Sequence, residues 1–150
     1  MTLHFEDLRP GNVYDLGEVT VDETEMLAFA RRFDPQPFHT DPVAAVDTPF
    51  GGLIASGFYT VSLWMRMYVD RVLADSTSEG SPGLSELRWL APVRAGDVLR
   101  GRLTVLESVP SSTRPGRGTA VLRGELLRDG EPVLRTTFRG LFGRRYPAAG

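Results

Sequence analysis

The segment from Gly57 to about Ala74 constrains the fold most, because its apolar residues fall on every side of a helical wheel. A helix that is apolar on most of its faces is normally buried. Its apolar residues are Phe58, Tyr59, Val61, Leu63, Trp64, Met65, Met67, Tyr68, Val69, Val72 and Leu73. Arg66, Asp70 and Arg71 interrupt them, so the segment falls short of the about 20 uncharged residues that span a bilayer. The sequence therefore predicts a helix enclosed by the rest of a soluble chain.

Four stretches after this helix have the pattern of β-strands. They alternate or cluster β-forming residues and cover Leu84–Ala91, Val98–Val109, Thr119–Leu127 and Pro132–Phe142. Asp129-Gly130 is a strong hairpin signal between the last two, and Ser111–Gly118 is expected to form the tip of another hairpin. A loop is expected over Asp75–Gly83, which is rich in Ser, Gly and Pro. We therefore expect an α+β fold in which long antiparallel strands wrap around one helix.

The residues before the buried helix predict a strand followed by an amphipathic helix. The strand covers Val13–Val21. Asp22 is a predicted N-cap and Glu25 follows three residues later, a capping-box pattern that begins a helix over roughly Glu23–Phe33. Its expected buried stripe consists of Met26, Leu27, Ala30 and Phe33.

Three prolines then shape the next segment. Pro35, Pro37 and Pro42 prevent the helix from continuing, because each removes a backbone donor and restricts the residue before it. An ordered, extended loop is expected here. Asp41 and Pro42 are suited to begin a short helix that continues through Val46.

Length and composition narrow the class of function. A chain of 150 residues suits one domain, residues 1–150, with one core. Its net charge of −2, without a basic run, argues against nucleic acid as a partner. The absence of cysteine excludes disulfides and thiolate nucleophiles, and it suits a cytoplasmic location. Met1–Asp7 lacks the pattern of a signal peptide. We therefore expect a small-molecule partner, and neither nucleic acid nor a membrane.

Asp34 and His39 are candidate catalytic residues, because they lie five residues apart in the proline-stiffened loop. Acid–base chemistry needs a carboxylate and an imidazole in fixed relation. In isolation such a pair is more often structural, with Asp34 ending a helix and His39 satisfied within a loop. His4, the other histidine, is expected on the surface of a charged N-terminal segment.

Other kinds of site have less support. A metal site lacks a second strong ligand beside His39, and no His-x-x-x-His pattern exists. Ser56 does not form the Gly-x-Ser-x-Gly elbow of a serine hydrolase, and Ser62 is interpreted as a small residue that allows close packing. Gly57 opens the buried helix. It is either an oxyanion donor at the positive end of the helix dipole or a glycine needed for close packing.

Three blocks in order resemble the MaoC-like dehydratase family, which includes the (R)-specific enoyl-CoA hydratases. The family has an Asp five residues before a His in a proline-containing loop, as Asp34 and His39 are here. Gly52-Leu53-Ile54-Ala55-Ser56-Gly57 matches the family's entry to its central helix, and Pro92-Val93-Arg94-Ala95-Gly96-Asp97 matches a later Pro-Val-x-x-Gly-Asp segment. The resemblance spans roughly Val13–Phe142 and implies a hot-dog fold, in which a long antiparallel β-sheet wraps around a central buried helix. It also implies a homodimer or a higher homo-oligomer.

This resemblance implies an enoyl-thioester hydratase or 3-hydroxyacyl-thioester dehydratase of fatty acid metabolism. Such an enzyme adds water across the double bond of a trans-2-enoyl thioester of CoA or of a carrier protein. Asp34 and His39 would be catalytic, and the Gly57 N–H would bind the thioester oxygen. No metal or organic cofactor is implied, because the CoA or pantetheine belongs to the substrate. The pocket candidates are Phe38, Phe50, Leu53 and Trp64. The alternatives are an acyl-CoA thioesterase and a non-catalytic acyl-thioester-binding subunit.

The chain departs from the family pattern at three positions. Gln36 stands where many members have Asn, and Ser56 stands where many have His or Pro. Met65 lies eight residues after the glycine, where the best-described hydratases have a serine, and Ser62 lies one helical turn earlier. A polar neighbour of the catalytic pair is therefore expected to be missing.

Overall fold

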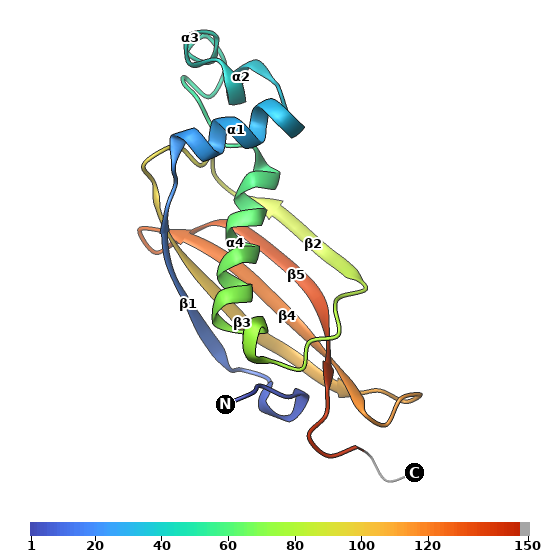
Figure 1. The fold of residues 1–150 in the computed structure, drawn as a ribbon. Helices are drawn as coiled ribbons and strands as arrows, with labels where there is room; N and C mark the ends of the chain where they lie inside the picture. Colours follow the sequence, from blue (N-terminus) through green and yellow to red (C-terminus); the bar gives the residue numbers. More distant parts are fainter. Residues whose placement is uncertain (148–150) are drawn as a thin grey trace.

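The computed structural model describes residues 1–147 and shows an antiparallel sheet wrapped around a helix (Figure 1). The strands are β1 (Val13–Thr20), β2 (Gly83–Trp89), β3 (Val98–Pro110), β4 (Arg117–Arg128) and β5 (Glu131–Gly143). Their order in the sheet is β1-β3-β4-β5-β2. The strands β3, β4 and β5 thus form a central meander with β1 and β2 at the edges. All of the strands predicted from the sequence are confirmed to within a few residues.

The two hairpins of the meander follow their sequence signals. Asp129 and Gly130 have φ angles of 52° and 81°, the left-handed values that a tight two-residue hairpin of this kind requires. The other hairpin, between β3 and β4, turns through residues 111–116. Both predicted turns are confirmed.

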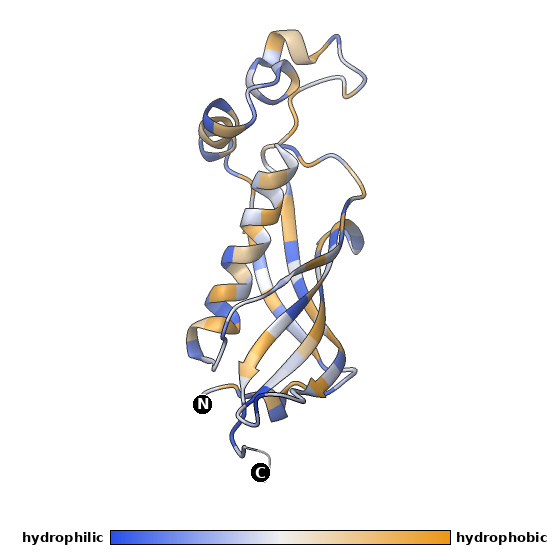
Figure 2. Ribbon diagram, turned by 90° about the vertical axis from the view of Figure 1, so that its right-hand side faces the viewer, coloured by the Kyte–Doolittle hydropathy of each residue, from blue (hydrophilic) through white to orange (hydrophobic). Residues whose placement is uncertain are grey.

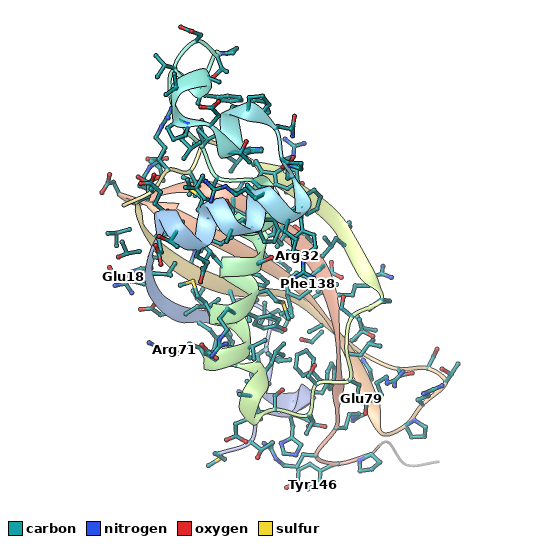
Figure 3. The ribbon with its side chains drawn as sticks, turned by 45° about the horizontal axis from the view of Figure 1, so that its top comes forward. Glu18, Arg32, Arg71, Glu79, Phe138 and Tyr146 are labelled. Carbon is teal, nitrogen blue, oxygen red and sulfur yellow. The ribbon has the colours of Figure 1, made fainter. Side chains whose placement is uncertain are left out.

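The central helix α4 (Gly57–Arg71) lies against the sheet. It buries Tyr59, Thr60, Trp64, Met67 and Tyr68. Trp64 packs closely on β4, because any side chain at Gly124 would collide with the Trp64 ring. Phe138 of β5 meets Trp64 and Tyr68 edge-on, with ring centroids 5.5 and 5.6 Å apart, and lies beside the helix in Figure 3. Sheet and helix therefore form the hot-dog architecture that the sequence resemblance implied.

The burial of α4 is one-sided: the face toward the sheet is buried, as predicted, whereas apolar residues elsewhere on the helix are exposed. Phe58 is 60% exposed and Met65 is 43% exposed. Figure 2 shows the reason: the sheet lies on one side of the helix, and no strand of residues 1–147 covers the other. Neither α4 nor any other helix in residues 1–147 has the length and apolar character needed to cross a membrane.

The helix α1 (Glu23–Phe33) begins where the sequence predicts, but its cap differs. Asp22 accepts a hydrogen bond from the Thr24 N–H at 3.0 Å. Glu25 does not complete a capping box. Its carboxylate instead accepts a hydrogen bond from the Tyr59 hydroxyl of α4, at 2.6 Å. A contact between two helices has replaced the local interaction.

The buried stripe of α1 is only partly as expected. Met26 and Ala30 are buried, whereas Phe33 is 63% exposed and its inclusion in the stripe is wrong. Phe29 instead packs toward the core through Tyr59, with ring centroids 5.7 Å apart. The Phe33 ring lies beside Phe29, with ring centroids 5.2 Å apart, and under the Arg32 guanidinium.

Two short helices, α2 (Pro37–Thr40) and α3 (Pro42–Ala45), follow α1. The expectation of an extended segment is wrong for α2. Pro37 occupies its first turn, where the missing N–H is not needed. The short helix after Asp41 is confirmed, and the Asp41 side chain accepts from the N–H groups of Val43 and Ala44. Both helices lie at the end of the molecule opposite to the N-terminus (Figure 1).

Candidate active site

A pocket of about 440 Å³ opens near the N-terminal end of α4. It lies between α2, the loop before α4, the first turn of α4 and the segment after β2. Its walls are mainly apolar and include Phe38, Phe50, Ile54, Phe58, Leu90 and Val93. Asp34, His39 and Gly57 also line it, so all three residues singled out for chemistry meet in one cavity.

His39 is held in a defined orientation inside this pocket. The side chain comes from α2, and the residue is only 5% exposed. Its Nδ1 lies 2.9 Å from the Ile54 carbonyl oxygen. A carbonyl oxygen can only accept, so Nδ1 carries a hydrogen. Nε2 lies 3.2 Å from Oδ2 of Asp34.

Asp34 follows the last residue of α1, and donors reach both of its carboxylate oxygens. Gln36 Nε2 donates to Oδ1 at 2.6 Å, and Ser56 Oγ donates to Oδ2 at 2.8 Å. Burial acts to raise the pKa of Asp34. The hydrogen bonds from Gln36 and Ser56, together with the charge of His39, outweigh burial and leave the pKa below its ordinary value. Asp34 is therefore a carboxylate at neutral pH.

Gly57 is the first residue of α4, at the positive end of the helix dipole. The first intrahelical hydrogen bond runs from the Thr60 N–H to the Ser56 carbonyl, so the Gly57 N–H precedes it. The Trp89 ring lies over Gly57, and a Cβ there would come within 2.5 Å of it. The Trp89 Nε1–H also donates to the Gly57 carbonyl at 2.8 Å. Close packing thus explains the glycine, and its N–H is still suited to bind an oxyanion.

The four predicted pocket residues divide into two groups. Phe38 and Phe50 line the pocket, with ring centroids 5.2 Å apart. Leu53 and Trp64 do not: Leu53 packs against the hydrophobic core, and Trp64 lines a separate apolar pocket of about 320 Å³. Trp64 lies two helical turns beyond Gly57 and faces the sheet, which carries it away from Asp34.

The expectation that the catalytic pair lacks a polar neighbour is wrong, because the Ser56 hydroxyl donates to Asp34 Oδ2 at 2.8 Å. Neither Ser62 nor Met65, however, takes the place of the family's serine. Ser62 is exposed on α4 and donates to the Phe58 carbonyl at 2.8 Å. Met65 lines the pocket of Trp64 instead. Neither side chain contributes to the cavity that contains Asp34 and His39.

Three contributors to the site were missed as such from the sequence. Ser56 and Gln36 appeared only as departures from a family pattern, yet both hold Asp34. Trp89 lies within a predicted strand, and nothing in that pattern links it to Gly57. As for metals, no three His, Cys, Asp or Glu side chains within residues 1–147 are grouped closely enough to hold an ion.

Comparison with known proteins matches this chain to one family. Residues 6–122 match the family described as MaoC like domain. The chain is 30% identical over 136 residues to the 3-hydroxybutyryl-CoA dehydratase of Methylorubrum extorquens, a match that covers 89% of this chain and 83% of that protein. It is 39% identical over 93 residues to nodulation protein N of Rhizobium leguminosarum bv. viciae, where the match covers 59% of this chain and only 58% of that protein.

The fold also has close counterparts among solved structures. The MaoC-like dehydratase from Rhodospirillum rubrum superposes with a TM-score of 0.87 and 38% sequence identity. The superposition covers 96% of this chain and 99% of that one. The similarity therefore includes the whole arrangement of sheet, central helix and loops around the pocket.

Proposed function

The chain belongs to the MaoC-like domain family, and from this premise we propose that it is a hydro-lyase that hydrates enoyl thioesters and dehydrates 3-hydroxyacyl thioesters. The main support is the pair of Asp34 Oδ2 and His39 Nε2, 3.2 Å apart in a pocket that Gly57 also lines. An apolar pocket suits the acyl chain, and the polar groups gather where its reacting carbons would lie.

In the proposed reaction, a water molecule is held by Asp34 Oδ2 and His39 Nε2. Nε2 removes a proton from the water as the water oxygen bonds to C3 of the trans-2-enoyl thioester. Electrons of the double bond move toward the thioester oxygen and form an enolate. The imidazolium then returns its proton to C2, so that one water molecule has been added. Dehydration uses the same steps in reverse.

The two partners of the pair have different tasks in this scheme. Donors on both oxygens lower the pKa of Asp34, which makes its carboxylate a weak base. Because Nδ1 donates to the Ile54 carbonyl, the neutral imidazole has its lone pair on Nε2, the nitrogen that faces Asp34. We therefore assign the proton transfers to His39, and to Asp34 the stabilisation of the imidazolium that forms beside it.

Gly57 supplies the proposed electrophilic partner. Its N–H at the start of α4 would donate to the thioester oxygen as negative charge develops there. Loss of one such donor typically costs about 3 kcal/mol of transition-state stabilisation. The proposal involves neither a metal nor an organic cofactor, because CoA or the pantetheine of a carrier protein enters as part of the substrate.

We also propose that the chain acts in the cytoplasm as a homodimer or higher homo-oligomer. The exposed apolar side chains on α4 and on the edge strand β2, such as Phe58, Met65 and Leu84, support self-association. An uncovered strand edge next to apolar residues is a surface suited to pairing with another chain.

Site-directed variants test the reaction. Asp34→Asn and His39→Ala should each abolish hydration of a short trans-2-enoyl-CoA, followed by the loss of enone absorbance, while circular dichroism remains unchanged. His4→Ala is a matched control at the far end of the molecule and should retain activity. Full activity in either site variant would rule out the mechanism.

Two alternatives can be separated in the same assay. A thioesterase would direct water at the carbonyl and release free thiol from the same enoyl-CoA. A non-catalytic subunit would bind the thioester without either change. Measuring thiol release and enone loss in parallel, over acyl chains of rising length, therefore identifies the reaction and its preferred substrate together.

A further inference from the structure

Ser56 occupies the N-cap position of α4 but does not cap the helix. A serine at this position normally accepts a hydrogen bond from one of the first free N–H groups of the helix. Here no such bond forms. The Ser56 hydroxyl instead donates to Oδ2 of Asp34, a residue distant in the sequence, at 2.8 Å. The hydroxyl that would normally cap α4 therefore binds a carboxylate that lines the pocket.

Burial distinguishes the hydrogen bond from Ser56 to Asp34 from the hydrogen bond that Gln36 donates to the same carboxylate. Ser56 is 0% exposed, so water cannot replace its hydroxyl without a rearrangement. Gln36, which donates to Oδ1, is exposed and competes with solvent. Oδ2 is also the oxygen that lies 3.2 Å from His39 Nε2. Ser56 therefore binds the same carboxylate oxygen, Oδ2, that lies beside His39.

We propose that Ser56 is a positioning residue whose hydroxyl keeps the Asp34 carboxylate ionised and directs Oδ2 toward His39. Ser56 is not among the residues that line the pocket, so it acts through Asp34 and not on the substrate. Within the part of the chain that the structure describes, the titratable side chain in contact with Asp34 is His39, whose Nε2 lies 3.2 Å from Oδ2.

The direct test is the titration of Asp34 itself, followed by carbon NMR of its carboxyl group without any substrate. A hydrogen bond to the charged form of an acid favours that form, so its loss raises the pKa. The pKa of Asp34 should be higher in Ser56→Ala than in the unsubstituted protein. Ser62→Ala removes an exposed hydroxyl from the same helix and should leave the titration unchanged.

A second readout rests on the proposed hydratase function. In Ser56→Ala, kcat should fall about tenfold, as expected for the loss of one hydrogen bond to a charged group. KM should stay within about twofold, because Ser56 does not contact the substrate pocket.

Ser56→Cys covers the case in which Ser56→Ala does not fold. Cysteine has nearly the same shape but is a weak donor, so the pKa of Asp34 should rise here too. An Asp34 titration that stays at its original position in the folded variant would overturn the proposal, as would a raised KM with unchanged kcat. If the unsubstituted protein hydrates no enoyl thioester, the proposed function fails, while the titration still decides the role of Ser56.

Discussion

Gly57 is the residue at which packing and the proposed chemistry depend most directly on each other. Gly57→Ala would place a Cβ within 2.5 Å of the Trp89 ring. Overpacking of this kind costs about 1–3 kcal/mol, and displacement of the first turn of α4 would also misplace the oxyanion donor. We expect a lower melting temperature and a fall in kcat/KM of more than about tenfold.

Gly116→Ala is the matched control for this change. Gly116 lies in the tip between β3 and β4, and a Cβ there meets no atom within 4 Å. Both its melting temperature and its kcat/KM should match those of the unsubstituted protein. Equal behaviour of the two alanine variants would show that the contact between Gly57 and Trp89 is unimportant.

The hydrogen bond between Trp89 and Gly57 can be tested by substitution. Trp89→Phe keeps an aromatic ring but removes the Nε1–H that donates to the Gly57 carbonyl. Such a hydrogen bond contributes about 0.5–1.5 kcal/mol, so kcat should fall by a factor of about 2 to 12. The free energy of unfolding should fall by no more than this amount, because Trp89 is 45% exposed. Steady-state kinetics and thermal unfolding of Trp89→Phe beside Trp89→Ala would separate the hydrogen bond from the ring contact.

The sequence could locate the catalytic pair but not the groups around it. Asp34 and His39 are close in the chain, and the prolines between them limit how the loop can bend. The partner of the Ser56 hydroxyl, by contrast, lies in a distant segment. Local pattern predicts a helix cap for such a serine, and only tertiary structure shows that the hydroxyl turns elsewhere.

Glu125 links the three central strands β3, β4 and β5 through ion pairs. This residue of β4 is 3% exposed and accepts from Arg102 of β3 and Arg135 of β5, at 2.9 and 3.0 Å. Burial acts to raise the pKa of Glu125, but hydrogen bonds from the two arginines outweigh it and leave the pKa below its ordinary value. Glu125→Gln should lower the free energy of unfolding at pH 7 by about 1–3 kcal/mol.

The free energy of unfolding lost in Glu125→Gln should depend on pH. A carboxyl group with a depressed folded-state pKa contributes stability that is fully present above its unfolded pKa, about 4.3 for Glu, and that disappears as pH falls through the folded pKa. The difference between Glu125→Gln and the unsubstituted protein should therefore shrink below about pH 4. Urea unfolding across pH measures it. Glu107→Gln, at an exposed residue of β3, is the control and should show no comparable difference.

Elements were predictable where one periodic pattern and one turn signal agreed. The meander followed from its runs of β-forming residues and from Asp129-Gly130. The helix α2 was missed because it is a single turn, too short for any periodicity to appear. The exposure of Phe33 was missed because the pattern of α1 does not show which of its apolar residues a neighbouring element covers.

For the whole molecule, the resemblance of three short blocks predicted the hot-dog fold, and the structure agrees with it. The apolar residues of α4 predicted a buried helix, but they did not indicate which of its faces the sheet covers. Phe58, Met65 and Leu84 remain exposed in one chain. Their exposure leads to a prediction about association.

Leu84 lies on the edge strand β2 and is 55% exposed. If copies of the chain associate through this edge, Leu84→Glu should shift sedimentation velocity toward the monomer, because it would bury a charge in the contact. Val109→Glu changes an apolar residue that is equally exposed, on β3, and should leave the distribution unchanged. A monomeric unsubstituted protein would contradict the prediction.

The strand order has a consequence for how the molecule folds. Short turns join β3, β4 and β5, whereas β1 pairs Val13 with Thr104 and β2 pairs Gly83 with Arg139. Contacts between residues so far apart in the chain carry a larger loop-closure cost and form slowly. The segment that carries Asp34, His39 and Gly57 connects these two edge strands. We therefore expect the meander to form early and the pocket late. A folding intermediate that contains the meander but not the pocket would have no catalytic activity.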